Sequence, residues 1–150
     1  MKEQAMFRIR WIGMGFLLMG VSPTPSLWNG TWRFSPERSS PGTIGSAAAA
    51  YRFKVEEDGS LRWEIPSRRE VLNGRLDGRP MPIVYPGAPS GLTLAVTGVS
   101  AAEWTYQVAK DGQVMGGGRM VLVDDGSAWV DLTRGRDGPG HGHMLVYVRS

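Results

Sequence analysis

The feature that most constrains the fold is an alternation of apolar and polar residues, interrupted at short intervals by Asx-Gly pairs. Tyr51, Phe53 and Val55, for example, alternate with Arg52 and Lys54. A period of two is typical of β-strands with one buried face. It runs through four segments: 51–55, 61–65, 92–96 and 102–108. Three more continuously apolar segments are also predicted to be strands: 119–123, 128–132 and 144–148.

Six Asx-Gly pairs punctuate these segments and favour the positive φ values of tight hairpins. They are Asp58-Gly59, Asn73-Gly74, Asp77-Gly78, Asp111-Gly112, Asp125-Gly126 and Asp137-Gly138. Short connections imply antiparallel pairing, because parallel strands need long crossovers. We therefore expect an all-β fold, a single antiparallel up-and-down meander of about eight strands closing into a barrel. A two-sheet sandwich is the alternative.

The first 26 residues have the three parts of a secretory signal. Lys2, Arg8 and Arg10 precede an apolar run at 11–21, and a segment rich in Ser, Thr and Pro follows it. The run is shorter than the roughly 20 residues that span a bilayer. We predict a signal peptide at 1–26, with an exported domain, periplasmic or secreted, at 27–150 and no integral membrane segment in it. An uncleaved anchor or a disordered tail is the alternative.

Charge and cysteine content exclude several function classes. The leader holds three of the 17 basic residues and one of the 14 acidic ones, which leaves 14 basic and 13 acidic residues. A domain so close to neutrality lacks the broad basic field of a nucleic-acid-binding protein, so no nucleic-acid partner is expected. The chain has no cysteine, which excludes thiol catalysis, iron–sulfur clusters and thiolate zinc sites.

The stretch at 29–39 (NGTWRFSPERS) resembles the start of small exported bacterial proteins of lipocalin-like, calycin type. The segments 110–119, 124–126 and 147–149 match their rhythm as well, so the resemblance covers most of residues 28–149. The proline-rich stretch at 78–91 and the run at 140–143 depart from it. The resemblance implies a barrel whose motif of Gly30 and Trp32 closes one end, with Arg149 lying across the indole. Such a stack contributes about 0.5–2 kcal/mol.

Aromatic residues on the apolar phase of the strands are the candidate ligand-binding residues. Inside a barrel they would either fill the core, which is their usual role, or line a space for one apolar ligand. Tyrosine hydroxyls and tryptophan N–H groups could orient that ligand. The candidates are Tyr51, Phe53, Trp63, Trp104 and Tyr106, with Tyr85 of the proline-rich loop at the mouth.

These features predict an exported protein that binds a small apolar molecule inside a barrel. The alternative is a structural or protein-interaction β domain of the cell envelope with a filled core. An enzyme would need a buried acid inside the barrel. The candidates for that acid are Glu64, Glu70, Glu103 and Asp131, and alternation places Glu64 and Glu103 outside. No catalytic residue and no cofactor is assigned.

Two further motifs have a functional and a structural interpretation. His141 and His143 are two residues apart, but a metal site would need a third ligand such as Asp131. An exposed turn is the competing interpretation, and no metal is assigned. Gly116-Gly117-Gly118 lacks the spacing of a phosphate-binding loop. Within a strand-like segment such a run indicates a β-bulge or a sharp bend.

Overall fold

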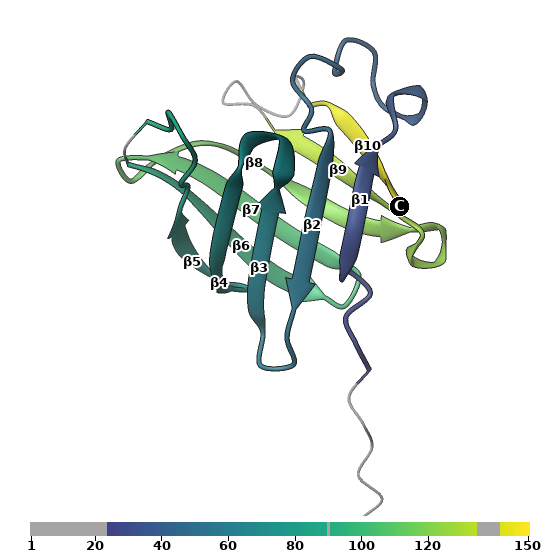
Figure 1. Ribbon diagram of the computed structural model, residues 1–150, viewed down its shortest axis with the longest axis horizontal. Coiled ribbons are helices and arrows are strands. Elements are labelled where there is room, and N and C mark those ends of the chain that lie inside the picture. The colour runs from purple at the N-terminus through teal and green to yellow at the C-terminus, as the bar shows by residue number, and fades with distance from the viewer. Residues whose placement is uncertain (1–23, 90, 135–141) are drawn as a thin grey trace, which may run out of the picture.

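Ten antiparallel strands form one sheet that wraps into a nearly closed barrel (Figure 1). The structure is a computed structural model that describes residues 24–89, 91–134 and 142–150. The strands are β1 (Gly30–Phe34), β2 (Ala50–Val55), β3 (Ser60–Ile65), β4 (Glu70–Arg75), β5 (Asp77–Pro82), β6 (Leu92–Ser100), β7 (Glu103–Lys110), β8 (Gln113–Val123), β9 (Ala128–Arg134) and β10 (Met144–Arg149). Three single-turn 3-10 helices join them: η1 (Pro36–Arg38), η2 (Pro66–Arg68) and η3 (Asp124–Gly126).

The ten strands form one continuous sheet because β1 pairs with β10, so that Trp32 lies opposite Arg149. Every other pair joins strands that are consecutive in the chain, in the order β4-β3-β2-β1-β10-β9-β8-β7-β6-β5. One continuous sheet of this kind is the predicted meander, and it is not the two-sheet sandwich. Among the described residues, no helix is long and apolar enough to cross a membrane.

A gap in the hydrogen-bonded ladder remains between β4 and β5, the two edges of the sheet. Pro80 and Pro82 lie in β5 and have no N–H to donate, which confines such a strand to an edge. The chain passes from one edge of the sheet to the other at Leu76. The carbonyl of Leu76 accepts a hydrogen bond from the backbone N–H of Gly98 at 3.1 Å. The Met81 side chain packs directly on Gly74, where any Cβ would overlap its sulfur.

The number of strands corrects the sequence-based expectation of about eight. The two additional strands are β4 and β5. Asn73-Gly74 was predicted to be a turn, but it lies inside β4, where the missing side chain of Gly74 makes room for Met81. The proline-rich stretch was predicted to be irregular, but it begins as β5, because an edge strand tolerates proline.

Asp77-Gly78 was likewise predicted to be a turn, but it begins β5. The pairs at 58–59, 111–112 and 125–126 form turns between strands as predicted. Asp111 and Gly112 join β7 to β8 with φ values of 49° and 81°, the left-handed geometry of a tight hairpin. Asp125 and Gly126 also have positive φ, at 53° and 81°, between β8 and β9. The predicted pair at 137–138 lies outside the described residues, as does most of the predicted leader.

One end of the barrel is closed by the segment that precedes β1. Trp28 stacks on Trp104 with ring centroids 4.1 Å apart, and its indole donates to the carbonyl of Ala101 at 3.0 Å. Trp32 donates to the carbonyl of Trp28 at 2.9 Å. The contact between Trp32 and Arg149 that the resemblance implies is present, with the guanidinium carbon 4.1 Å from the ring centroid. All three indoles are buried, so this half of the interior is filled.

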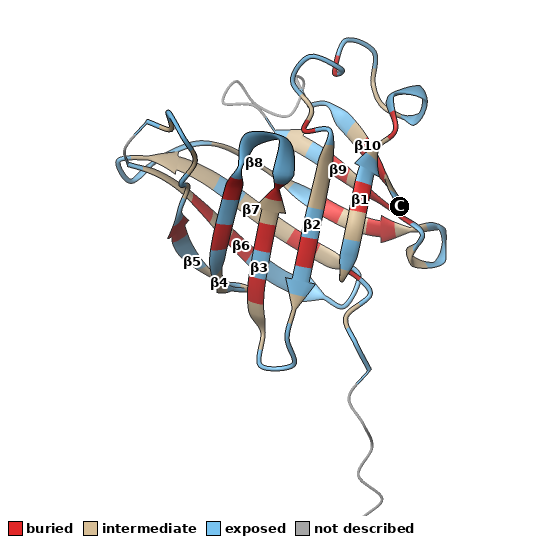
Figure 2. Ribbon diagram, in the orientation of Figure 1, coloured by how far each residue is buried: buried red, intermediate tan, exposed pale blue. Residues whose placement is uncertain are grey.

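The opposite end of the barrel is more open. Buried and more exposed positions alternate along β3 and β4, as the period of two predicts (Figure 2). The loop at 35–49 packs beside this end, where the Tyr147 hydroxyl donates to the carbonyl of Ala48 at 3.0 Å. Several inward-facing side chains here are only half-buried: Phe34, Tyr51, Ile83, Tyr106, Val108 and Leu145.

Candidate functional site

A hydrogen bond between Tyr106 and Asp131 crosses the interior at the open half. The Tyr106 hydroxyl donates to the two carboxylate oxygens at 2.9 and 3.1 Å. Tyr106 belongs to β7 and Asp131 to β9, and Gly118 of the intervening β8 lies opposite Tyr106. A Cβ on Gly118 would lie 2.7 Å from the Tyr106 hydroxyl oxygen. The phenol therefore reaches β9 only because this position is glycine.

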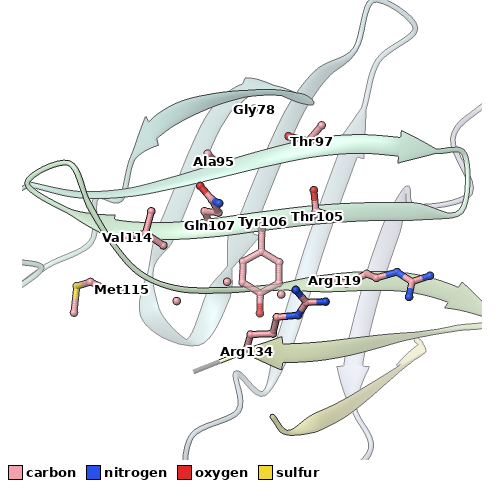
Figure 3. A pocket seen from close by; sticks show the side chains of 13 residues that line it. Gly78, Ala95, Thr97, Thr105, Tyr106, Gln107, Val114, Met115, Arg119 and Arg134 are labelled. Carbon is pink, nitrogen blue, oxygen red and sulfur yellow. The ribbon is translucent and has the colours of Figure 1, made fainter. Parts of the chain in front are cut away.

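A β-bulge, as predicted for this segment, lies directly before the glycine run of β8. Val108 pairs with Gly116 and the next residue of β7, Ala109, pairs with Val114, so Met115 is the extra residue. Figure 3 shows Tyr106 extending from β7 across β8 toward β9. The run thus shapes the strand and frees space for an inward side chain, which the sequence pattern alone did not reveal.

Asp131 is a buried carboxyl without a charged partner among the described residues. It is 6% exposed, and Tyr106 is its only hydrogen-bond partner there. Burial raises the pKa of Asp131 to about 7, although the Tyr106 hydrogen bond partly opposes this. The carboxyl therefore titrates near neutral pH, which is typical of groups that bind ligands or transfer protons.

Glu70 is the second buried carboxyl of the interior. It opens β4 opposite Ile65 and is also 6% exposed. It has no hydrogen bond or ion pair with any described residue. Burial raises the pKa of Glu70, and the charge of Arg68 partly opposes this. Both acids that the sequence left as inward candidates are therefore buried.

Four aromatic rings pack together in the same half of the interior as these acids. The Tyr51 ring packs edge-on against Trp63, Trp129 and Tyr147, with centroid distances of 5.2, 5.4 and 5.0 Å. Tyr147 stacks on Trp129 at 4.3 Å. Burial, and next the charge of Asp131, raise the pKa of Tyr51. These contacts make a largely apolar wall in the same half of the interior as the two carboxyls.

Two indole N–H groups in this wall have no acceptor among the described residues. They belong to Trp63 and Trp129, which are 5% and 0% exposed. A buried donor left unpaired costs about 1–3 kcal/mol. Such a group in a native structure calls for a bound water, an ion or a ligand as its partner. The unpaired N–H groups identify this part of the interior as the candidate site.

The predicted ligand-binding residues fall into three groups. Tyr51, Trp63 and Tyr106 lie together in the open half. Trp104 faces inward too, but it stacks on Trp28 at the filled end. Phe53 lies between the two groups, with its ring centroid 5.4 Å from that of Trp104 and 4.9 Å from that of Trp63. Tyr85 is half-buried in the loop after β5, and no described contact joins it to the others.

The sequence did not identify Trp129 and Tyr147 as site residues. Both lie in segments where consecutive residues are apolar, so the alternation that would assign them to the inner face is missing. Glu70 was named only as an acid of unassigned position. The signal that could have found Trp129 is its spacing of two from Asp131, which puts both side chains on one face.

The acids predicted to face outward do so. Glu64 forms ion pairs with Arg52 and Arg62 at 3.2 and 2.5 Å, and Glu103 pairs with Arg119 at 2.5 Å. His143 is exposed, whereas His141 lies outside the described residues. Within the ranges that the structure describes, no three His, Cys, Asp or Glu side chains are grouped closely enough to hold a metal.

Two grooves are lined by residues of the described strands, and Tyr106 is part of the lining of the larger one. The larger, about 550 Å³, runs over β6 to β9, where the glycines of β8 leave the surface hollow (Figure 3). Its polar lining residues include Thr97, Thr105, Gln107, Arg119 and Arg134. The smaller, about 390 Å³, lies over β1 to β3 and has the outward-facing Arg52, Lys54, Arg62 and Glu64 in its lining.

Comparison with known proteins assigns no family. No protein-family model matches the chain, and no curated protein has significant sequence similarity to it. The fold of the described residues is a nearly closed antiparallel β-barrel, and its chemistry is concentrated in the open half of the interior. The function is therefore argued from that site.

Proposed function

We propose that this protein is an exported, lipocalin-like barrel that binds a small, mostly apolar molecule in the open half of its interior. The observation that carries the proposal is the pair of unpaired indole N–H groups, on Trp63 and Trp129, within a wall of aromatic rings. A ligand with a hydrogen-bond acceptor would satisfy these donors while its apolar part covers the rings.

The two ends of the barrel differ, which supports a binding site that is open at one end and closed at the other. One end is filled by Trp28 and covered by the pair of Trp32 and Arg149. At the other end, inward-facing side chains such as Val108 and Leu145 are only half-buried. Covering such surface contributes about 25 cal/mol per Å² of apolar area removed from water. The driving force for binding is therefore available at the open end.

The lipocalin-like assignment and the export of the protein rest on sequence features. The motif of Gly30 and Trp32 begins β1, and Arg149 lies over its tryptophan. The segment at 1–26 has the pattern of a cleaved signal peptide. Mass spectrometry of the secreted or periplasmic protein tests the export step, since the expected N-terminus of the mature chain is Leu27.

The binding proposal is tested by titrating the protein with the neutral fluorophore N-phenyl-1-naphthylamine. We expect saturable binding of one molecule, accompanied by a change in tryptophan emission. Trp63→Phe keeps an aromatic ring and removes one unpaired N–H, so it should alter the affinity for ligands that carry an acceptor. Trp104→Phe, at the filled end, is the matched control. Absence of saturable binding, together with absence of any co-purifying small molecule, would contradict the proposal.

A second candidate is a structural or protein-interaction domain of the cell envelope. The unpaired edge of β4 favours it, because an exposed edge can accept a strand from another chain. Val71 of that strand is 37% exposed. This candidate predicts no small-molecule binding and a partner whose binding is lost when Val71 is replaced by proline, which cannot donate to an added strand.

A further inference from the structure

The open half of the interior contains two buried carboxyls that no described cation neutralises. Asp131 comes from β9 and Glu70 from β4, and each is 6% exposed. Neither forms an ion pair with a described residue. Buried acids are normally paired or coordinate a cation, because an isolated buried charge is costly. Two of them in one barrel therefore point to a positive partner that binds from outside.

The charges of both carboxyls raise the pKa of the same tyrosine, Tyr51. After burial, the charge of Asp131 is the largest influence that raises the pKa of Tyr51, and the charge of Glu70 raises it as well. Asp131 also raises the pKa of Tyr147. Tyr51 also packs on Trp63, whose partner in β4 is Leu72, two residues after Glu70, and on Trp129, two residues before Asp131. Because residues two apart in a strand share a face, both acids lie on the inner face beside one cluster of rings.

The rings of this cluster are in close contact. Tyr51, Tyr147 and Trp129 pack against one another through centroid distances of 5.4, 5.0 and 4.3 Å, and the Tyr106 hydroxyl is bonded to Asp131. Ring faces attract organic cations, most strongly where water is excluded. Carboxyls beside several aromatic rings thus combine two independent sources of affinity for a positive charge.

Arg68 is the cation whose charge acts on this region. It lowers the pKa of Glu70, Tyr51 and Tyr147, but only as a secondary influence on each. Its guanidinium donates to the carbonyl of Ser46 at 3.4 Å, in the loop beside the open end. Arg68 is exposed and is engaged at the rim, so it leaves the two carboxyls unpaired.

We propose that the ligand of the open half is an organic amine, whose ammonium group binds between Asp131 and Glu70 against the tyrosine rings. This inference rests on the proposed function and adds the chemical class of the ligand. The apolar body of the amine would cover the aromatic wall. The N–H groups of Trp63 and Trp129 are then available to an acceptor on that body, such as an ether or carbonyl oxygen.

The test compares three probes that share a phenyl body and differ in charge. They are 2-phenylethylamine, 2-phenylethanol and 3-phenylpropanoate, titrated into the protein by calorimetry at pH 8. We expect the amine to bind at least about tenfold more tightly than the alcohol, and the carboxylate to bind most weakly.

Isosteric variants locate the ammonium site. Asp131→Asn and Glu70→Gln should each weaken amine binding by about tenfold and change alcohol binding by less than about twofold. Glu64→Gln is the matched control, because it removes one negative charge from the outer face of β3. Circular dichroism and thermal unfolding establish that each variant is folded before it is titrated.

The outcomes separate this inference from the proposed function. Equal affinity for the amine and the alcohol overturns the amine assignment and leaves the barrel as a binder of neutral molecules. Equal weakening of all three probes in Asp131→Asn also overturns it, because the carboxyl would then be structural. Failure of all three probes, while the neutral fluorophore binds, refutes the amine class alone. Failure of the fluorophore as well contradicts the proposed function itself.

Discussion

The Tyr106 hydroxyl holds the Asp131 carboxyl by a hydrogen bond that passes over Gly118, the residue of β8 that lies between their strands. This relationship ties a glycine in an apparent low-complexity run to the electrostatics of the interior. It depends on the absence of a single carbon atom, so it can be tested by adding that atom.

Gly118→Ala should destabilise the protein by about 1–3 kcal/mol, as expected for overpacking. The added Cβ would lie 2.8 Å from both the Tyr106 ring and the Leu132 carbonyl, so the phenol must move away from Asp131. Urea unfolding measures the effect. Gly45→Ala is the control, since a Cβ there meets nothing within 4 Å. Equal stability of the two variants would show that the ring is not confined as described.

Asp131→Asn should make the protein more stable above pH 7. The pKa of this carboxyl is raised from 3.8 to about 7 on folding, so unfolding releases its proton between these values. The free energy of unfolding therefore falls as the pH rises through that range, by roughly 4 kcal/mol at most. The variant lacks this loss and should match the unmodified protein near pH 3.

Urea unfolding at several pH values measures this dependence. Part of the slope should persist in Asp131→Asn, because burial also raises the pKa of Glu70. An identical slope in the variant and the unmodified protein would mean that Asp131 does not titrate in this range.

Tyr106→Phe should raise the pKa of Asp131 further. The hydrogen bond from Tyr106 stabilises the ionised carboxyl and is the influence that lowers this pKa. Removing the hydroxyl leaves burial unopposed, so the titration moves above about pH 7. Carbon-13 NMR of the aspartate carboxyls follows it directly. Tyr85→Phe, in the loop after β5, should leave the Asp131 titration where it is.

Arg149→Ala should cost about 2 kcal/mol, more than a typical surface substitution. The guanidinium lies over Trp32 and donates to the carbonyls of Asn29, Leu27 and Gly126 at 2.7, 2.6 and 3.1 Å. Arg149→Lys should recover only part of the loss, because an ammonium cannot reach all three carbonyls in one plane.

Thermal unfolding followed by tryptophan fluorescence measures the Arg149 variants. Arg79→Ala is the matched control, because the Arg79 side chain is 85% exposed and pairs with Asp77 only at 3.5 Å. A loss in Arg149→Ala no larger than in Arg79→Ala would mean that the cation contributes little to closing this end of the barrel.

The fold was largely predictable because most strands have one buried face and one solvent-exposed face. Period two placed Phe53, Trp63 and Trp104 on the inner face, and the structure has them there. It failed for β4 and β5, the edge strands. β5 contains Pro80 and Pro82, which are tolerated because this strand has no partner on its outer side, and β4 contains Gly74, whose missing side chain makes room for Met81. Edge status depends on the whole sheet and cannot be read from a local segment.

The candidate site was less predictable, because it depends on register between distant strands. Asp131 is flanked by Val130 and Leu132, so its own segment does not reveal which face is buried. Glu70 belongs to a strand that the pattern missed. The unpaired state of both acids is a property of the closed barrel, in which β4 and β9 lie far apart in the sheet order.

The pairing of β1 with β10 has a kinetic consequence. The ladder between β1 and β10 joins the first and last strands of the described chain, so it cannot form until β10 is available to pair. Contacts of such long sequence separation also slow folding, because the closure entropy is lost before the contact is gained. Until β10 pairs, the edges of β1 and β9 stay exposed, so this pairing is the step that commits the barrel to its shape.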